Sequence, residues 1–211
     1  MPVEVELKYR AGGPGVLRRL ETVERLGPAA LDPAQRTDET DRYLDTPDGR
    51  LAAAGWACRL RSRGGTTWLS LKGPPDPGTA DAVHRRPELE APADERPDPA
   101  GWPPSEARAL LDRLRDGRPL VERFRLRQGR TERLVRLDGT ALGTLSLDVV
   151  HVLHRGDERG VLYAVELELA DDGPAGEAGL DVLDAALAEI DGIEPDDRTK
   201  LERALDLLPD R

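Results

Sequence analysis

The sequence predicts a mainly β (α+β) protein: an antiparallel sheet or closed barrel with helices packed against its outside. Segments with the period-two alternation of strands follow one another along most of the 211 residues. Only a few segments have the spacing of amphipathic helices. Strands that follow one another without intervening helices favour an antiparallel sheet over a doubly wound one. The length suits one domain, which we place at residues 1–211.

Nine segments alternate between polar and apolar residues as strands do. They are residues 2–10, 39–46, 57–63, 66–73, 84–91, 120–128, 131–138, 144–152 and 161–170. The third and fourth are separated by Gly64-Gly65, which predicts a two-residue hairpin turn because glycine adopts the positive φ angles that such turns require.

Four segments have the pattern of helices, and their apolar faces would cover the barrel. They are residues 15–26, 105–116, 177–190 and 197–208. Ser105 precedes the second and Asp196 precedes the fourth, and both residue types favour the N-cap position. Proline-rich loops at 74–80 and 92–104 flank the strand 84–91.

On most predicted strands, one face carries charged side chains at every second position. In the first strand Glu4, Glu6 and Lys8 share a face, and the opposite face is apolar. An ordinary sheet directs such a face to water. Here, however, these faces are almost entirely Arg, Glu or Asp, with arginines on some strands and carboxylates on others. A closed barrel with the charged faces inward would place both sets around one cavity.

Such a cavity has a chemical use. Arginine guanidinium groups bind phosphate oxygens in pairs. Carboxylates with no histidine among them suit Mg²⁺ or Mn²⁺ rather than zinc. The two sets together predict a site for a metal–polyphosphate complex, in which the metal neutralises charge and the arginines hold the transferred group.

The composition excludes several classes of protein. With 41 acidic and 31 basic residues the net charge is −10, whereas a general nucleic-acid binder is basic. No apolar run approaches the roughly 20 residues of a membrane span, so we expect no membrane partner. The N-terminus lacks the pattern of a secretory signal. The single cysteine, Cys58, cannot form an internal disulfide, which favours a cytoplasmic location. The oligomeric state stays open.

Lysine is rare in this chain. Of the 31 basic residues only Lys8, Lys72 and Lys200 are lysines, and the others are arginines. An ammonium group is a compact point charge that a planar guanidinium does not replace well. These three positions are therefore candidates for a specific role.

The charged motifs resemble those of the CYTH domain, the family of triphosphate tunnel metalloenzymes. Glu4-Val5-Glu6-Leu7-Lys8 is similar to the family's ExExK signature, and further motifs follow in the family's order. They are Tyr43-Leu44-Asp45-Thr46, Arg59-Leu60-Arg61, Leu69-Ser70-Leu71-Lys72, Arg86-Pro87-Glu88-Leu89-Glu90, Arg125 with Arg127, Asp148, Glu166 with Glu168, and Lys200. The resemblance covers nearly the whole chain.

The resemblance implies an eight-stranded antiparallel, tunnel-like closed barrel with a charged lumen, so one of the nine predicted strands would be short or spurious. It implies that phosphates are bound by Lys8, Arg59, Arg61, Lys72, Arg86, Arg125, Arg127 and Lys200. It implies that Mg²⁺ or Mn²⁺ is bound by Glu4, Glu6, Asp148, Glu166 and Glu168, with Glu88 and Glu90 as further candidates. The catalytic residues would be Glu4, Glu6, Lys8, Lys72 and Glu168.

Four functions remain open from the sequence. The first is metal-dependent hydrolysis of a linear triphosphate: inorganic triphosphate foremost, because no base pocket is evident, or thiamine or nucleoside triphosphate. The second is a class IV-type adenylate cyclase, in which the ribose 3′-hydroxyl of ATP replaces water. The third is a non-catalytic module that binds polyphosphate or nucleotides. The fourth is a structural protein whose charges form a solvated sheet face.

Four further residues are expected to lie outside the chemistry. Cys58 alternates away from Arg59 and is expected in the barrel wall. His84 and Arg133 are expected at the solvated surface. Trp68 shares the face of Lys72 but is expected to pack at the end of the barrel.

Overall fold

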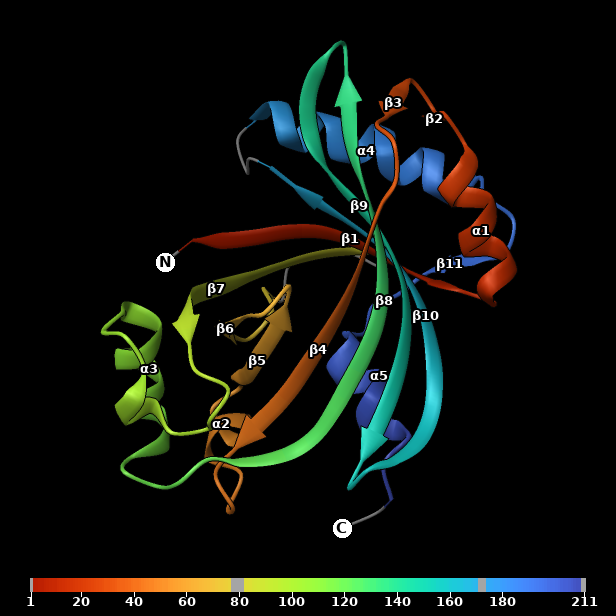
Figure 1. Cartoon of the computed structure of the whole chain (residues 1–211). Helices are drawn as coiled ribbons and strands as arrows, with labels where there is room; N and C mark the ends of the chain where they lie inside the picture. Colours follow the sequence, from red (N-terminus) through yellow and green to blue (C-terminus); the bar gives the residue numbers. More distant parts are fainter. Residues whose placement is uncertain (1, 77–81, 171–173, 210–211) are drawn as a thin grey trace.

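Eight long antiparallel strands close into a barrel in the computed structural model, which describes residues 2–76, 82–170 and 174–209 (Figure 1). The strands are β1 (Val3–Ala11), β4 (Gln35–Asp45), β5 (Ala57–Arg63), β6 (Thr66–Lys72), β7 (Val83–Ala93), β8 (Val121–Leu137), β9 (Thr140–His154) and β10 (Asp157–Leu169). They are ordered β8-β4-β5-β6-β7-β1-β10-β9, and pairing of β8 with β9 closes the barrel. The predicted fold class is confirmed.

Eight strands arise where nine were predicted because β8 is a single strand of 17 residues. The predicted strands 120–128 and 131–138 are its two halves, and β8 pairs with β9 across the expected break, Gly129 opposite Val149. The predicted hairpin between β5 and β6 is confirmed. Gly64 and Gly65 form its turn with φ angles of 56° and 80°.

Three short strands that the alternation did not predict extend the sheet. They are β2 (Arg25–Leu26), β3 (Ala29–Leu31) and β11 (Ile193–Pro195). β3 pairs with β8, and β11 pairs with β1. The first predicted helix is too long for this reason: α1 (Pro14–Thr22) ends before the segment that forms β2.

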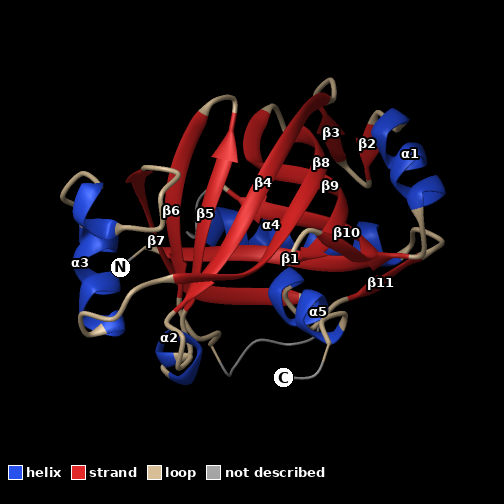
Figure 2. Cartoon of the chain, turned by 60° about the horizontal axis from the view of Figure 1, so that its bottom comes forward, coloured by secondary structure: helices blue, strands red, loops and turns tan. Residues whose placement is uncertain are grey.

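Helices cover the apolar outer faces of the strands on two sides of the barrel (Figure 2). The helices α1 and α4 (Pro174–Ala188) pack on β1, β9 and β10 around Leu7, Leu145 and Leu167. On the other side, α2 (Arg50–Ala53), η1 (Pro99–Gly101) and α3 (Glu106–Arg115) pack on β5, β6 and β7. Ser105 caps α3 as predicted, because its hydroxyl accepts a hydrogen bond from the Arg108 N–H at 3.1 Å.

The last helix, α5 (Lys200–Asp206), begins later than predicted. Its N-cap is Thr199 rather than Asp196. The Glu202 N–H donates to the Thr199 hydroxyl at 3.2 Å, and the Thr199 N–H donates to Oε2 of Glu202 at 2.7 Å. This capping box fixes the first residue of the helix, Lys200, at the point where α5 meets the barrel.

The inner face of the barrel is charged over one part of its length and apolar toward one end. At that end Tyr43 stacks on Phe124 with ring centroids 4.7 Å apart. Val150 and Val152 join this cluster, and Ala204 of α5 packs against it. The lumen is therefore filled by side chains at the α5 end, and the open space is confined to the charged part. In the described residues, no helix is long and apolar enough to cross a membrane.

Candidate functional site

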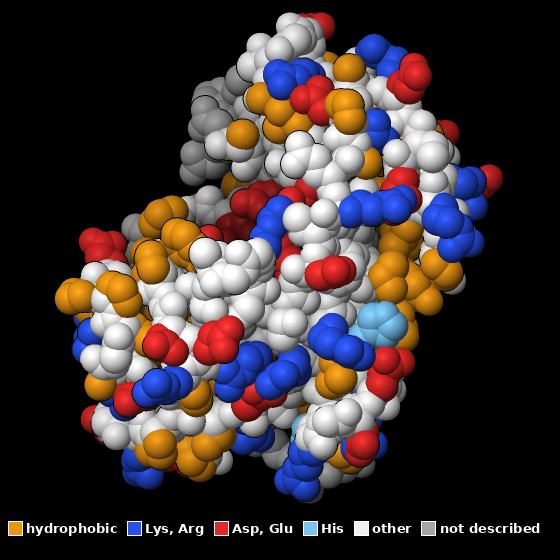
Figure 3. Space-filling model, viewed as in Figure 1, with side chains coloured by type: hydrophobic (Ala, Val, Ile, Leu, Met, Phe, Trp, Pro, Cys, Tyr) orange, Lys and Arg blue, Asp and Glu red, His pale blue; other side chains and the backbone are white. Residues whose placement is uncertain are grey.

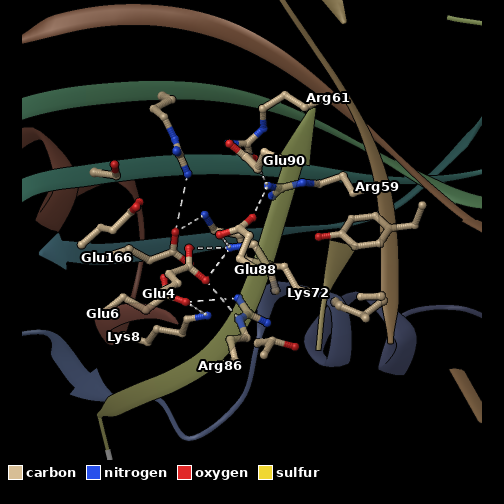
Figure 4. A pocket seen from close by; sticks show the side chains of 18 of the residues that line it. Glu4, Glu6, Lys8, Arg59, Arg61, Lys72, Arg86, Glu88, Glu90 and Glu166 are labelled. Carbon is tan, nitrogen blue, oxygen red and sulfur yellow. Dashed lines mark hydrogen bonds and ion pairs between the residues drawn. The ribbon is translucent and has the colours of Figure 1, made fainter. Parts of the chain in front are cut away.

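A cavity of about 190 Å³ lies inside the barrel and is walled by charged side chains (Figure 4). In the space-filling view, acidic and basic side chains lie in the hollow at the centre of the face shown (Figure 3). All eight strands and the N-terminus of α5 contribute to the wall. The charged side chains that line it are those of Glu4, Glu6, Lys8, Arg59, Arg61, Arg63, Lys72, Arg86, Glu88, Glu90, Arg130, Glu132, Glu166, Glu168 and Lys200.

Strand register explains why residues distant in the sequence meet in this cavity. β1 lies between β7 and β10. Glu6 is opposite Glu168 and Lys8 is opposite Glu166 across β1 and β10, and Glu4 is opposite Arg86 across β1 and β7. Because side chains alternate between faces, these residues all point inward. The structure thus brings together the two glutamate pairs, from β1 and β10, that the resemblance assigns to metal binding.

Lys72 and Arg86 hold the carboxylates at the β1 side of the cavity. Lys72 Nζ donates to Oε1 and Oε2 of Glu4 at 2.5 and 2.7 Å and lies 3.3 Å from Oε2 of Glu88. Arg86 donates to Glu4 at 3.2 Å and to Glu6 at 3.1 Å. Although burial opposes ionisation, Lys72 and Arg86 keep the pKa of Glu4 below its usual range. The Glu4 carboxylate is therefore an anion in the folded protein.

Lys200 ties α5 to β9 and β10. Its Nζ lies 2.5 Å from Oδ2 of Asp148 and 2.6 Å from Oε2 of Glu166. Arg130 forms a bidentate pair with the same aspartate, with both N–O distances 2.8 Å. Burial opposes ionisation of Glu166, but Lys200, Lys8 and Arg130 keep its pKa well below the usual range. Asp148 itself is fully buried and outside the cavity lining.

The contacts of Asp148 bear on its expected role as a metal ligand. It was expected to hold metal, but both of its oxygens accept charged hydrogen bonds from Arg130 and Lys200 within the wall. Asp148 therefore orients two cations that line the cavity. The alternation placed it on the inner face correctly, but only the packing of α5 shows that this position is covered.

Two arginines of β5 face the cavity from the opposite side. Arg59 donates to the Ser70 hydroxyl at 3.2 Å and lies 3.8 Å from carboxylate oxygens of both Glu88 and Glu90. Arg61 forms a bidentate pair with Asp41, with both N–O distances 2.8 Å. Arg59 and Arg61 thus present guanidinium groups to the cavity, as expected for phosphate binding.

Glu168 differs from the other carboxylates. Glu168 lines the cavity and is exposed. Its partial desolvation there, together with the negative charges of Glu4, Glu6 and Glu88, raises its pKa to about 7. Like charges that approach one another disfavour the ionised form, and a cation that binds among them favours it. Glu168 is therefore under an excess of negative charge on the acidic side of the cavity, where β1 and β10 adjoin.

The acidic side has the donor chemistry of a Mg²⁺ or Mn²⁺ site, because it offers hard carboxylate oxygens with no sulfur or imidazole among them. Within the described ranges, no three potential ligands are already arranged around one metal position. Lys72 and Arg86 occupy the oxygens of Glu4 in this conformation. A bound metal would therefore share or replace these contacts.

Arg125 and Arg127 are not in the cavity, which corrects their expected role. Both lie on the outer face of β8, where Arg127 is exposed and Arg125 pairs with Glu122 at 3.1 Å. The inward residues of this segment are Phe124, Leu126 and others of even number. The polar face was assigned inward, but at this end of the barrel the inner face is apolar because it packs against α5.

Several residues of the site were missed from the sequence. Arg130 and Glu132 line the cavity from β8, Tyr43 lines it from β4, and Asp41 lies in the wall behind the arginines. Arg130 and Glu132 continue the even-numbered face of β8. That signal was hidden because the strand was divided at residues 129–130.

Of the four residues expected to lie outside the functional site, one is where it was expected and three are not. Cys58 is buried in the wall, and burial raises the pKa of its thiol. Trp68 is 41% exposed rather than packed. His84 is buried rather than at the surface, with Nε2 2.8 Å from the Asp196 carbonyl oxygen. Arg133 is also buried, where it donates to main-chain carbonyls that include those of Leu20 and Asp32.

Comparison with known proteins identifies relatives of the whole chain. A family model for the CYTH domain matches residues 2–205. No curated protein sequence matches the chain at a significant level. Similar solved structures include HpAC1 from Hippeastrum, a candidate adenylyl cyclase described as having a dominant triphosphatase activity. It is 23% identical, the match covers 96% of this chain and 95% of that one, and the TM-score is 0.69.

Two microbial structures are also similar. A candidate adenylate cyclase from Bacillus halodurans is 20% identical, with 96% of this chain and 98% of that one covered and a TM-score of 0.59. The protein PH1819 from Pyrococcus horikoshii is 18% identical, with 95% and 98% covered and a TM-score of 0.55. At these identities the structures support the fold alone.

Proposed function

The chain belongs to the CYTH domain family, and from that premise we propose that it is a metal-dependent hydrolase of linear triphosphates, with inorganic triphosphate as its first substrate. The observation that carries the proposal is the cavity itself. Arginines and lysines line it together with carboxylates, four of which lie where β1 and β10 adjoin. A polyphosphate needs the first set, and its metal counter-ion needs the second.

In this proposal Arg59, Arg61 and Arg86 bind phosphate oxygens through their planar guanidinium groups. Lys8, Lys72 and Lys200 add point charges where β1, β6 and α5 reach the cavity. Charge on the transferred phosphoryl group spreads over its oxygens in the transition state, so fixed cations around it stabilise that state. The barrel walls hold these cations before substrate arrives.

Glu4, Glu6, Glu166 and Glu168 would hold the metal, with Glu88 and Glu90 beside them. When bound, the Mg²⁺ or Mn²⁺ ion would neutralise the phosphate chain and polarise it for attack. One carboxylate of this set would orient the attacking water.

The test is incubation of the purified protein with inorganic, thiamine and nucleoside triphosphates, each with Mg²⁺, with Mn²⁺ or with EDTA. Release of orthophosphate that requires a divalent metal is the expected result. A chain that binds triphosphate, as shown by a thermal shift, but releases no phosphate with either metal would be a binding module. If triphosphate causes no thermal shift and no phosphate is released, the protein neither binds nor hydrolyses triphosphate.

A class IV-type adenylate cyclase is the second candidate, and one observation favours it. A second pocket of about 470 Å³ adjoins the first and shares Ala57, Lys72 and Arg86 with it. Trp56 and Pro74 line this second pocket, whose wall is mainly apolar. Such a surface suits the organic part of a nucleotide, so the assay with ATP should also be scored for cyclic AMP.

A further inference from the structure

Asp41 is a buried carboxylate on which the two arginines of β5 converge. It is 1% exposed and lies behind the cavity wall rather than in the lining. Its Oδ1 accepts from Nε of Arg61 at 2.8 Å. Its Oδ2 accepts from a second nitrogen of Arg61 at 2.8 Å and from Arg59 at 3.4 Å. One aspartate thus contacts both guanidinium groups.

A third donor completes this arrangement. Nε2 of Gln128, on β8, donates to Oδ2 of Asp41 at 2.9 Å and to Oε2 of Glu39 at 3.2 Å. β4 lies between β5 and β8, so Asp41 receives donors from both neighbouring strands. Although burial opposes ionisation, Arg59 and Arg61 hold the pKa of Asp41 well below its usual range. The carboxylate is therefore a permanent anion within the wall.

Two guanidinium groups at neighbouring inward positions of one strand repel each other, and without a fixed anion they would spread apart or turn to solvent. The carboxylates that line the cavity cannot supply that anion throughout a reaction, since a metal ion would compete for them. Asp41 can, because its oxygens are buried and its donors come from the protein itself.

From this geometry we infer that Asp41 is a positioning residue, which holds Arg59 and Arg61 in the orientation that receives the phosphate chain. The inference rests on the proposed function, since it assigns a role in binding the same substrate. Asp41 touches neither substrate nor metal and acts through the two arginines. Gln128 supports it from the opposite strand.

The experiment is a double-mutant cycle read as the dissociation constant for inorganic triphosphate, measured by calorimetry. Asp41→Asn keeps the shape of the side chain and removes its charge. It should weaken triphosphate binding at least about tenfold, because the loss of a charge-assisted contact raises the dissociation constant by about that factor. In a background of Arg59→Ala with Arg61→Ala, the same change should alter binding by less than about twofold, because the residues through which it acts are gone.

Asp45 provides the matched control. It is a buried aspartate of the same strand, whose carboxylate accepts hydrogen bonds from the backbone N–H groups of Thr46 and Leu51 at 2.7 and 2.9 Å. Asp45→Asn should lower the melting temperature and leave triphosphate binding unchanged. Asp41→Glu retains the charge, so it should bind triphosphate more tightly than Asp41→Asn.

The outcomes separate the inference from the proposed function. Wild-type affinity in Asp41→Asn, or an equal loss in the two backgrounds, would overturn the positioning role. If Asp41→Asn does not fold, the same cycle is run with Asp41→Glu. If Asp41→Glu weakens triphosphate binding equally with and without Arg59 and Arg61, the positioning role is likewise overturned. Absence of triphosphate binding by the wild-type protein would instead contradict the proposed function.

Discussion

Lys72 Nζ lies 2.5 Å from Oε1 of Glu4, and this contact joins β6 to β1 across the intervening strand β7. Both side chains line the cavity. Glu4 is among the proposed metal ligands, and Lys72 is among the proposed phosphate-binding residues. In the unliganded protein the two groups therefore neutralise each other. When a metal–triphosphate complex binds, Glu4 would contact the metal and Lys72 would contact a phosphate group instead.

Replacement of Lys72 by arginine tests whether the compact ammonium matters. The larger, planar guanidinium cannot contact Glu4 and Glu88 from the same position without moving one of them. We expect Lys72→Arg, and likewise Lys8→Arg, to lower the catalytic rate severalfold with little change in melting temperature. Lys200→Arg should mainly raise the Michaelis constant, because Lys200 comes from α5 and not from a strand of the barrel. Wild-type kinetics in the first two variants would show that any cation suffices.

The two glutamates of β10 should respond in opposite ways to neutralisation. Glu166 pairs with Lys200 at 2.6 Å, so Glu166→Gln should destabilise the metal-free protein. Glu168 faces like charges, so Glu168→Gln should raise the melting temperature at pH 8. The doubly substituted protein should show no metal-dependent turnover. Thermal melts with EDTA and phosphate-release assays measure these effects, and a lower melting temperature for Glu168→Gln would contradict the like-charge argument.

Glu168 also predicts a pH dependence for the stability of the metal-free protein. Its pKa in the folded state, about 7, is raised above the value of 4.5 for an unperturbed glutamate. The folded state therefore binds the proton more tightly, and protonation stabilises it. This contribution should grow as the pH falls from 8 toward 5. The difference in melting temperature between wild type and Glu168→Gln should shrink over that range, and a constant difference would argue against it.

Arg59 and Arg125 test the difference between the inner and outer faces of the barrel. Arg59 lines the cavity, whereas Arg125 pairs with Glu122 on the outside. Arg59→Ala should weaken triphosphate binding at least about tenfold, because a charge-assisted hydrogen bond contributes on the order of 1.5–3 kcal/mol. Arg125→Ala should leave binding and turnover nearly unchanged. Equal losses in the two variants would mean that the cavity is not the binding site.

Arg133 predicts a stability effect without a functional one. It is 5% exposed, and its guanidinium donates to the carbonyl oxygens of Leu20 at 3.1 Å and Asp32 at 2.9 Å, among others. It joins the end of α1 to β8. Arg133→Ala leaves several buried carbonyls without donors and should reduce the free energy of unfolding by about 3 kcal/mol. Denaturant unfolding measures this loss, with the half-exposed Arg136→Ala as control. Similar small losses of unfolding free energy in Arg133→Ala and Arg136→Ala would contradict a structural role for Arg133.

Much of the barrel could be predicted because alternation reports directly on strands with one charged and one apolar face. β1 and β5 to β7 are such strands, and Glu4, Arg59, Lys72 and Arg86 were assigned to the cavity correctly. The alternation shows which residues share a face but not which face is inside. That is why Arg125 was misplaced on β8, where the inner face is apolar.

The remaining gaps arise from tertiary contacts. Asp148 is covered by Lys200, which comes from a helix 52 residues later in the chain. Arg133 is buried because distant carbonyls of α1 and the β3 region surround it. Asp41 gains its partners from β5 and β8, on either side of its own strand. No local pattern around these residues records such partners.

The pairing of β1 with β10 also has a consequence for how the chain reaches its native state. β1 is made first, yet one of its edges is completed by a strand that begins at residue 157. Until then, that edge presents unpaired N–H and C=O groups that can associate with other chains. Closure depends on contacts between distant segments, which slows folding. We therefore expect slow refolding, and aggregation that increases with protein concentration while the first strand awaits its partner.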